Sequence, residues 1–402
     1  MRTPIYAATI AATLLGATAT TDNQPKAPYS QRMATSIMSR SQGIMTGTGG
    51  SSEALQAGFV QRALTVLSEQ YPDDTAEAQA YIRSSVSSTT LFLSNATNDV
   101  DTFPLDRLST GNVMLRCGGS TSATTTALSA LRRSVDLNPR NSEGGLWYFV
   151  YPNWSYLDGM FSYAPFFTLY TLTKTANAAS VTSALDDMLN QLDLLWSHTI
   201  HPSGLLSHGY DETRTAVWAN PVTGASPEVW GRAMGWYTMA LADTIEILVN
   251  KKGPAKYVWA LLEKFQALMP AVMNNVEPHT GGWLQIVDQF GREGNYIESS
   301  GTAMFTYSLL KGARLGYLPK QVAPKAVQVA TRAYNYLVDN FVVEEHNGTL
   351  SYNGTVSVCS LNSTANYDYY VHQPIQFNSV LGSGAFVLAS VEMERLVSPP
   401  HH

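Results

Sequence analysis

Gly281-Gly282-Trp283-Leu284, followed by Ser300-Gly301-Thr302-Ala303-Met304-Phe305, is one copy of a motif that occurs four times in this sequence. In each copy, a glycine and a hydrophobic or aromatic stretch precede a helix that opens on small residues and then becomes aromatic. The leading glycines recur at about 60 to 80 residues, a period that is typical of helical hairpins stacked around one centre. The other three copies pair Gly144-Gly145-Leu146-Trp147-Tyr148 with Leu157-Asp158-Gly159-Met160-Phe161, Gly204-Leu205-Leu206 with Trp230-Gly231-Arg232-Ala233-Met234-Gly235-Trp236, and Gly348-Thr349-Leu350-Ser351-Tyr352 with Gly382-Ser383-Gly384-Ala385-Phe386.

Helical periodicity dominates the rest of the chain. It predicts twelve helices, over 30–44, 53–70, 74–94, 105–117, 121–135, 156–175, 180–199, 228–250, 254–275, 298–315, 321–342 and 378–396. Short strands are expected over 283–287, 349–352 and 355–359. Long helices that alternate with short glycine-rich connections give six hairpins. The predicted fold class is therefore all-α, an (α/α)6 barrel with an inner ring of helices inside an outer ring; an open solenoid is the alternative.

The inner ring is assigned to the helices that start near Gly231, Gly301 and Gly384, because small residues allow close approach at a crowded axis. Loops at one end of such a repeated scaffold are where a functional site is usually built. We therefore expect the site at the end of the barrel where the leading glycines of the repeated motif lie.

The first 19 residues have the pattern of a secretory signal, with Arg2, an apolar stretch over 5–15, and Ala17-Thr18-Ala19 as a cleavage site. The apolar stretch is too short to span a bilayer. We expect removal of 1–19, a single domain over 20–402, and a secreted, extracellular protein without a membrane partner. Five Asn-x-Ser/Thr sequons agree with export, at Asn95, Asn153, Asn347, Asn353 and Asn362.

Composition excludes some classes of protein. The chain has 402 residues, of which 45% are hydrophobic and 14% charged, so it can bury a large core. Its net charge of −6 argues against nucleic-acid binding, which needs a basic surface. The histidines are scattered without metal-ligand spacing, and we expect no metal, no cofactor and a monomer. The two cysteines, Cys117 and Cys359, either pair in an oxidising compartment or are two separate buried thiols.

Asp158 is the strongest candidate for chemistry. It stands among aromatic and aliphatic residues in Tyr151-Pro152-Asn153-Trp154-Ser155-Tyr156-Leu157-Asp158-Gly159-Met160-Phe161. Apolar surroundings disfavour the charged form of a carboxyl, which is how a carboxyl serves as a proton donor near neutral pH. The alternative is that Asp158 only caps the helix that follows it.

Three further polar groups are candidates. His208 lies in a glycine-containing loop and can hydrogen-bond a sugar or move a proton, although a structural role is the commoner one. Arg232 begins a helix, where a cation opposes the helix dipole, so it needs an anionic partner from the protein or from a ligand. Trp236 lies four residues on, on the same helix face. Asp106 is either a second carboxylate of the site or the first-turn acid of its own helix.

Taken in order, these motifs resemble the unsaturated glucuronyl and galacturonyl hydrolases. The run over 157–166, then 208–211, then 230–236 and 298–305, is most similar to the unsaturated rhamnogalacturonyl hydrolases, glycoside hydrolase family 105, which are related to family 88. The resemblance covers roughly residues 50–396 and implies an (α/α)6 barrel. It also implies a substrate with a 4,5-unsaturated uronic acid at its non-reducing end, left there by a polysaccharide lyase.

The resemblance implies particular roles as well. Asp158 matches the general acid/base, which protonates C4 of the double bond and then activates water toward C5. His208, Arg232 and Trp236 match residues that hold the unsaturated sugar. Two departures affect sugar preference: Tyr148 stands where family members often have a histidine, and Met234 where they have an asparagine. Tyr148, Trp154, Met234 and Asp106 complete the predicted substrate-binding set.

Three hypotheses stay open on the sequence alone. The first is a hydrolase of unsaturated uronyl oligosaccharides, with unsaturated galacturonyl-rhamnose from rhamnogalacturonan I as the expected substrate. The second is a different enzyme on the same barrel, either an ordinary inverting glycosidase, which needs two carboxyls, or a lyase. The third is a non-catalytic protein that binds acidic sugars.

Overall fold

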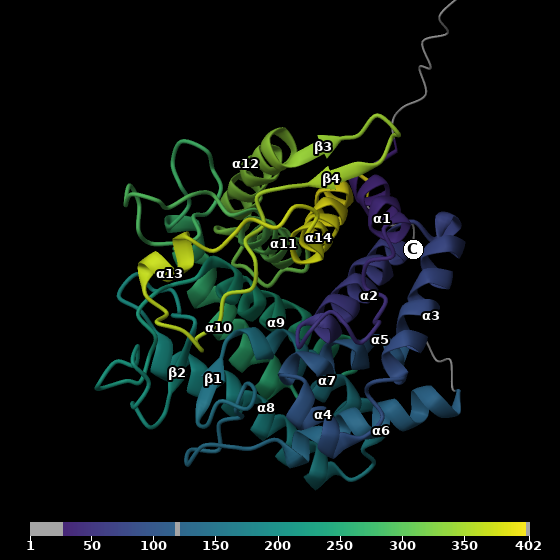
Figure 1. Ribbon diagram of the computed structural model, residues 1–402, viewed down its shortest axis with the longest axis vertical. Helices are drawn as coiled ribbons and strands as arrows, with labels where there is room; N and C mark the ends of the chain where they lie inside the picture. The colour runs from purple at the N-terminus through teal and green to yellow at the C-terminus, as the bar shows by residue number, and fades with distance from the viewer. Residues whose placement is uncertain (1–26, 117–120, 399–402) are drawn as a thin grey trace, which may run out of the picture.

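The computed structural model describes residues 27–116 and 121–398, and its long helices form a closed double ring (Figure 1). Neighbouring inner segments pack against each other in order, and the last, α14, packs back against the first, α2. An open solenoid would leave these two ends apart, so the predicted (α/α)6 barrel is confirmed. The inner ring consists of α2 (Glu53–Gln70), η2 (Leu105–Thr110) with α5 (Gly111–Arg116), α7 (Asp158–Lys174), α9 (Gly231–Asn250), α11 (Ser299–Arg314) and α14 (Val380–Val397).

The outer helices differ from the inner ones in how they bury their side chains. Helix α12 buries one face, which consists of Ala326, Ala330, Ala333, Tyr334 and Leu337. That is the pattern of a helix that covers a core from one side. Helix α9, by contrast, is buried on all sides for most of its length. The outer ring consists of α1 (Tyr29–Ser39), α3 (Ala76–Thr90), α6 (Ser122–Leu137), α8 (Ala178–Thr199), α10 (Ala255–Asn274) and α12 (Ala323–Phe341).

The four leading glycines of the repeated motif occupy equivalent tight turns. Gly144, Gly204, Gly281 and Gly348 have φ values of 86°, 80°, 84° and 82°, which are costly for any residue with a side chain. In each turn the glycine N–H donates to a carbonyl three or four residues back, as Gly204 does to His201. Each turn follows an outer helix and precedes an inner one. The glycines therefore return the chain toward the axis at the same end of four of the six hairpins.

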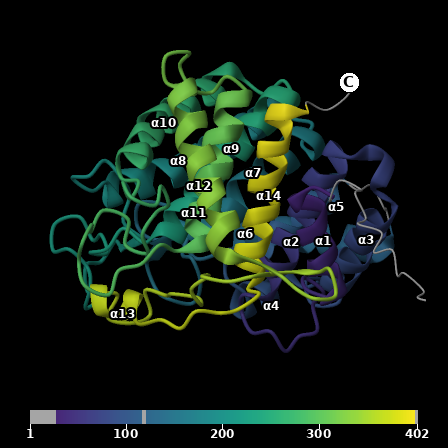
Figure 2. The same ribbon diagram turned by 90° about the horizontal axis from the view of Figure 1, so that it is seen from above.

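The connections gather at that end of the barrel. Figure 2 shows α9, α11, α12 and α14 side by side, with the short helix α13 (Tyr367–Val371) and long loops beyond one end of them. Two small antiparallel ladders also lie in the connections: β1 (Trp154–Tyr156) pairs with β2 (Gly209–Asp211), and β3 (Val342–Glu344) pairs with β4 (Leu350–Tyr352). The expected strand over 349–352 corresponds to β4.

Other expectations about short elements were wrong. Residues 283–287 form isolated bridges, from Ile286 to Trp230 and from Leu284 to Ile297, rather than a strand. Residues 355–359 likewise form one bridge, between Val356 and Ile375. Both runs are apolar because they are buried between connections, and burial produces the same residue pattern as a strand. Helix α4 (Ala96–Thr102) and helix α13 are too short for periodicity to reveal.

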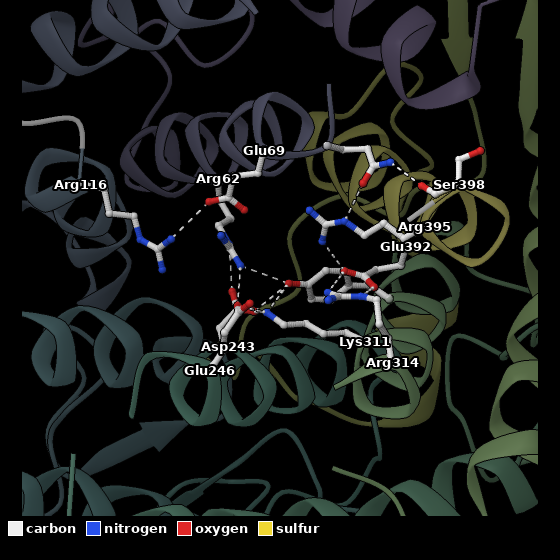
Figure 3. A network of polar contacts seen from close by, with 12 residues as sticks. Arg62, Glu69, Arg116, Asp243, Glu246, Lys311, Arg314, Glu392, Arg395 and Ser398 are labelled. Atoms are coloured by element: carbon white, nitrogen blue, oxygen red, sulfur yellow. Dashed lines mark hydrogen bonds and ion pairs between the residues drawn. The ribbon is translucent and has the colours of Figure 1, made fainter. Parts of the chain in front are cut away.

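A network of buried charges fills the barrel toward the C-terminal ends of the inner helices (Figure 3). Asp243 of α9 accepts hydrogen bonds from Arg62 of α2, at 3.0 Å, and from Tyr307 and Lys311 of α11, at 2.7 and 2.5 Å. Lys311 also donates to Glu246, at 2.7 Å. The side chains of these helices point toward one another, so the network ties three members of the inner ring together.

Other features bear on the predicted environment. Within residues 27–116 and 121–398, no helix combines the length and the apolarity needed to cross a bilayer. Cys359 is a buried free thiol, whereas the predicted signal over 1–19 and Cys117 lie outside the described residues. The side chains of Asn347, Asn353 and Asn362 are exposed, as glycan acceptors need to be.

Candidate active site

A cavity of about 110 Å³ opens at the end of the barrel where the glycine turns lie. The first residues of several inner helices reach it, including Asp158 of α7, Arg232 of α9 and Leu381 of α14. Asp106, Asp158 and Arg232 are the charged side chains that line it. The lining comprises Ser51, Ser52, Leu55, Pro104, Asp106, Tyr148, Phe149, Tyr151, Tyr156, Asp158, Trp230, Arg232, Trp236, Val358, Cys359, Ser360 and Leu381.

Asp158 is the first residue of α7, and its carboxyl faces the cavity with the residue only 8% exposed. Oδ2 of Asp158 lies 3.0 Å from Nε2 of His208, but without the alignment of a hydrogen bond. In the described part of the chain both atoms are buried without a hydrogen-bond partner. Buried polar atoms in native proteins normally have partners, so these two atoms are candidates for contact with a ligand or with water.

Asp106 lies in the same cavity, at the start of η2, and is 2% exposed. Its Oδ2 accepts a hydrogen bond of 2.7 Å from the hydroxyl of Tyr148, while its Oδ1 is buried without a partner. Burial raises the pKa of the Asp106 carboxyl to about 7, with the charge of Asp158 acting in the same direction and the Tyr148 hydroxyl against it. Asp106 thus lines the same cavity as Asp158 and is also the first-turn acid of η2. Near neutral pH, Asp106 therefore carries a proton in part of the molecules.

Replacing Tyr148 tests whether this proton is used. In Tyr148→Phe the hydrogen bond that stabilises the ionised Asp106 is lost, so the pKa of Asp106 rises above its value of about 7. If activity needs the proton of Asp106, we expect the alkaline limb of the kcat/KM profile to move to higher pH. A pH series on the wild type, on Tyr148→Phe and on Tyr334→Phe checks this. Tyr334 bonds Ser390 inside the helical core, so its variant keeps the wild-type profile. A limb that stays in place or moves down contradicts the expectation.

Arg232 has its anionic partner within the protein. Its Nη1 lies 3.9 Å from the carboxylate of Glu298 and donates to the carbonyl of Val356 at 2.7 Å, while Nη2 donates to the carbonyl of Ser357 at 2.5 Å. The guanidinium also lies 4.7 Å from the ring centre of Trp230, a cation–π distance. These contacts fix a buried cation at the cavity wall, where a ligand carboxylate can also reach it.

Trp236 lines the cavity on the same helix as Arg232, as the spacing of four residues predicts. Its ring packs against Phe161 at 4.7 Å and Phe59 at 4.8 Å, so it is also part of the core. Tyr148 and Tyr156 add further aromatic lining, and their rings stack 4.3 Å apart.

Three predicted substrate-binding residues do not line this cavity: His208, Trp154 and Met234. His208 is fully buried, beside Asp158. Trp154 lies on β1 and packs against Trp218 at 5.2 Å. Met234 is fully buried, and its sulfur accepts a hydrogen bond from the backbone N–H of Leu206 at 3.2 Å. Asp211 accepts hydrogen bonds from the backbone N–H groups of Thr213, Thr215 and Ala216, which order its own loop.

Several lining residues were missing from the predicted set. Tyr151 and Tyr156 flank Trp154 in the motif around Asp158, and Trp230 begins the motif of Arg232, so their positions carried a signal. The segment over 358–360 carried none, because it reaches the cavity from a long connection far along the chain. Within residues 27–116 and 121–398, no three His, Cys, Asp or Glu side chains are grouped as metal ligands would be.

Comparisons with known proteins agree with this geometry. The model of Glycosyl Hydrolase Family 88 matches residues 29–397. A family 105 glycoside hydrolase of C. acetobutylicum has a similar structure, with a TM-score of 0.77 and 30% identity over 92% of this chain and 99% of that chain. An unsaturated glucuronyl hydrolase of Bacillus sp. GL1, which is 13% identical, shares the fold over 92% of this chain and 96% of that chain, with a TM-score of 0.64.

A curated relative matches part of the chain. The 24.9 kDa protein of the picA locus of Rhizobium radiobacter is 35% identical over 214 residues, which are 52% of this chain and 90% of that protein. The family match extends from α1 to α14 and so includes every element of the barrel and of the cavity. The chain therefore belongs to glycosyl hydrolase family 88, within the family 88 and 105 group of unsaturated uronyl hydrolases.

Proposed function

We propose that this enzyme removes a 4,5-unsaturated uronic acid from the non-reducing end of lyase-generated oligosaccharides, with unsaturated galacturonyl-rhamnose as its substrate. The observation that carries the proposal is the pair of buried carboxyls, Asp158 and Asp106, in a cavity that also holds the cation Arg232. The carboxyls supply a proton, and the cation attracts an acidic sugar.

The cavity favours an anion for a second reason. Helices α7 and α9 both begin at its wall, and the N-terminal end of a helix carries partial positive charge. The aromatic rings of Tyr148, Tyr156 and Trp236 form flat surfaces around the same space. A uronic acid combines a carboxylate with an apolar ring face, and both parts find complementary groups here.

The chemistry that we propose uses one carboxyl twice. Asp158 donates its proton to C4 of the C4=C5 double bond, and the positive charge that forms at C5 is shared with the ring oxygen. The Asp158 carboxylate then takes a proton from water as the water oxygen bonds to C5, which restores the acid. The resulting hemiketal opens and the bond to the leaving sugar breaks. One water molecule is consumed for each sugar released.

An assay with a panel of disaccharides tests the proposal. Incubation with an unsaturated uronyl disaccharide is expected to lower the ultraviolet absorbance of the conjugated double bond, with the highest kcat/KM for unsaturated galacturonyl-rhamnose. Three results would contradict it. A rise in absorbance on a polymer indicates a lyase, release of sugar from a saturated disaccharide indicates an ordinary glycosidase, and binding without turnover indicates a sugar-binding protein.

A further inference from the structure

The imidazole of His208 is held between two groups from different parts of the chain. Its Nδ1 lies 2.7 Å from the hydroxyl of Tyr370, and its Nε2 lies 3.0 Å from Oδ2 of Asp158. His208 and Tyr370 are both completely buried. Tyr370 belongs to α13, in the connection between β4 and α14, which Figure 2 shows beyond the ends of the barrel helices.

We propose that Tyr370 is a positioning residue, which holds His208 as the neutral tautomer with its proton on Nε2, facing Asp158. The proposal rests on the proposed function only in giving Asp158 its part in catalysis. The tautomer itself is a property of the unliganded protein and can be measured without a substrate.

The two neighbours of the ring decide where the proton sits. On the Nε2 side the neighbour is a carboxyl, whose ionised form can only accept hydrogen bonds. A proton on Nε2 therefore points at an acceptor, and even the protonated carboxyl keeps one oxygen that accepts. A bare Nε2 would place its lone pair against negative charge as soon as the Asp158 carboxylate forms. Nδ1 is then the acceptor and needs a donor. The Tyr370 hydroxyl can donate, and burial raises its pKa well above the usual range, so it keeps its proton.

Tyr370 is itself fixed by the cavity wall. Its backbone carbonyl accepts a hydrogen bond of 3.0 Å from the side chain of Gln285, and Gln285 in turn accepts one of 3.1 Å from the indole of Trp230. The rings of Tyr370 and Trp230 also lie within 6.0 Å of each other. Because Trp230 lines the cavity, these contacts fix the position of Tyr370 relative to the cavity lining, which includes Asp158.

This arrangement has a consequence for the reaction. With Nε2 protonated, the ring can donate to Asp158 when its carboxylate forms after proton transfer, and it can release that bond when the carboxyl is protonated. Without the Tyr370 hydroxyl, the proton can move to Nδ1 and the ring no longer presents a donor to Asp158. The rate of the chemical step should then fall, while the groups that bind the uronate are unchanged.

The first measurement is kinetic, on Tyr370→Phe beside the wild type. We expect kcat to fall roughly tenfold or more, as enzymes lose rate when a catalytic histidine takes the wrong tautomer, with KM within about a factor of two. Tyr334→Phe is the matched control, because it removes a buried hydroxyl that bonds Ser390 away from the cavity. A kcat of Tyr370→Phe within twofold of that control would overturn the proposal, and so would a rise in KM that accounts for the whole loss.

The second measurement is the ¹⁵N spectrum of the histidine rings in the wild-type protein without substrate, with His208 assigned by its absence in His208→Gln. We expect Nε2 of His208 to carry the proton in the wild type and the two tautomers to mix in Tyr370→Phe. A proton on Nδ1 in the wild type sinks the inference whatever the variant does. If the wild type turns over no unsaturated sugar, the proposed function fails, and the spectrum still decides the tautomer.

Discussion

Asp158→Asn is expected to abolish turnover of unsaturated uronyl disaccharides, with kcat reduced by about 10³-fold or more, because general acid and general base steps together account for that much. The amide is nearly the same size as the carboxyl but can neither give a proton to C4 nor take one from water. Binding should change little, because Arg232 and the aromatic walls stay in place. The decay of ultraviolet absorbance, followed from single turnover to steady state, measures both kcat and KM.

Asp136→Asn is the control for this variant. Asp136 makes an exposed ion pair of 2.7 Å with Arg132 on α6, so the same chemical change there should leave kcat and KM unaltered. Asp106→Asn separates the two carboxyls of the cavity. It removes the partner whose pKa is raised, but it leaves the group that Nε2 of His208 faces. Retention of more than a tenth of the wild-type rate by Asp158→Asn would show that another group carries the proton.

The sequence predicted the barrel because its repeat is a physical necessity of the fold. Four of the six hairpins turn at the same end through a residue with positive φ, so the glycines at 144, 204, 281 and 348 recur with the hairpin period. The inner helices were recognisable for a related reason, since a side chain on Gly301 would meet the backbone of Gly231 at 3.0 Å. The strands β1 and β2, which pair in one ladder, have three residues each and carry no such periodic signal.

The site was predictable where its residues begin inner helices. Asp158 and Arg232 stand at the helix starts of two copies of the repeated motif, and the fold brings the starts of these helices together. Tyr370 and the 358–360 segment were not predictable, because they come from a long connection whose path depends on tertiary contacts. The raised pKa of Asp106 depends on burial and on the charge of Asp158, which a linear sequence does not display.

The largest loss of stability is expected at the other end of the barrel, in Asp243→Asn. Asp243 is 5% exposed and lies between Arg62 and Lys311 (Figure 3). The variant keeps the shape of the side chain but leaves the buried Lys311 and the half-buried Arg62 with Glu246 as their remaining carboxylate. Removing one partner from a buried ion pair costs about 3–5 kcal/mol, because the other charge is left uncompensated. Urea unfolding at pH 7, followed by circular dichroism, measures the loss.

The pH dependence of this loss identifies its cause. Burial alone would raise the pKa of Asp243, but the charges of Arg62 and Lys311 lower it below the usual range. A carboxyl whose pKa is lowered by folding stabilises the folded state at every pH above the pKa that it has in the unfolded chain. That stabilisation disappears as the pH falls through the pKa that the carboxyl has in the folded protein. The difference between wild type and Asp243→Asn should therefore be widest at neutral pH and shrink below about pH 4, near the pKa of an aspartate in an unfolded chain.

Asp136→Asn again supplies the comparison, because an exposed ion pair contributes only about 0–1 kcal/mol. If Asp243→Asn costs no more than Asp136→Asn, the attraction within the network is offset by the cost of burying its charges. A loss that does not change with pH would instead point to packing, since a cavity or a lost contact does not depend on protonation. The size of the loss and its pH profile together therefore show whether Asp243 stabilises the barrel by charge pairing or by packing.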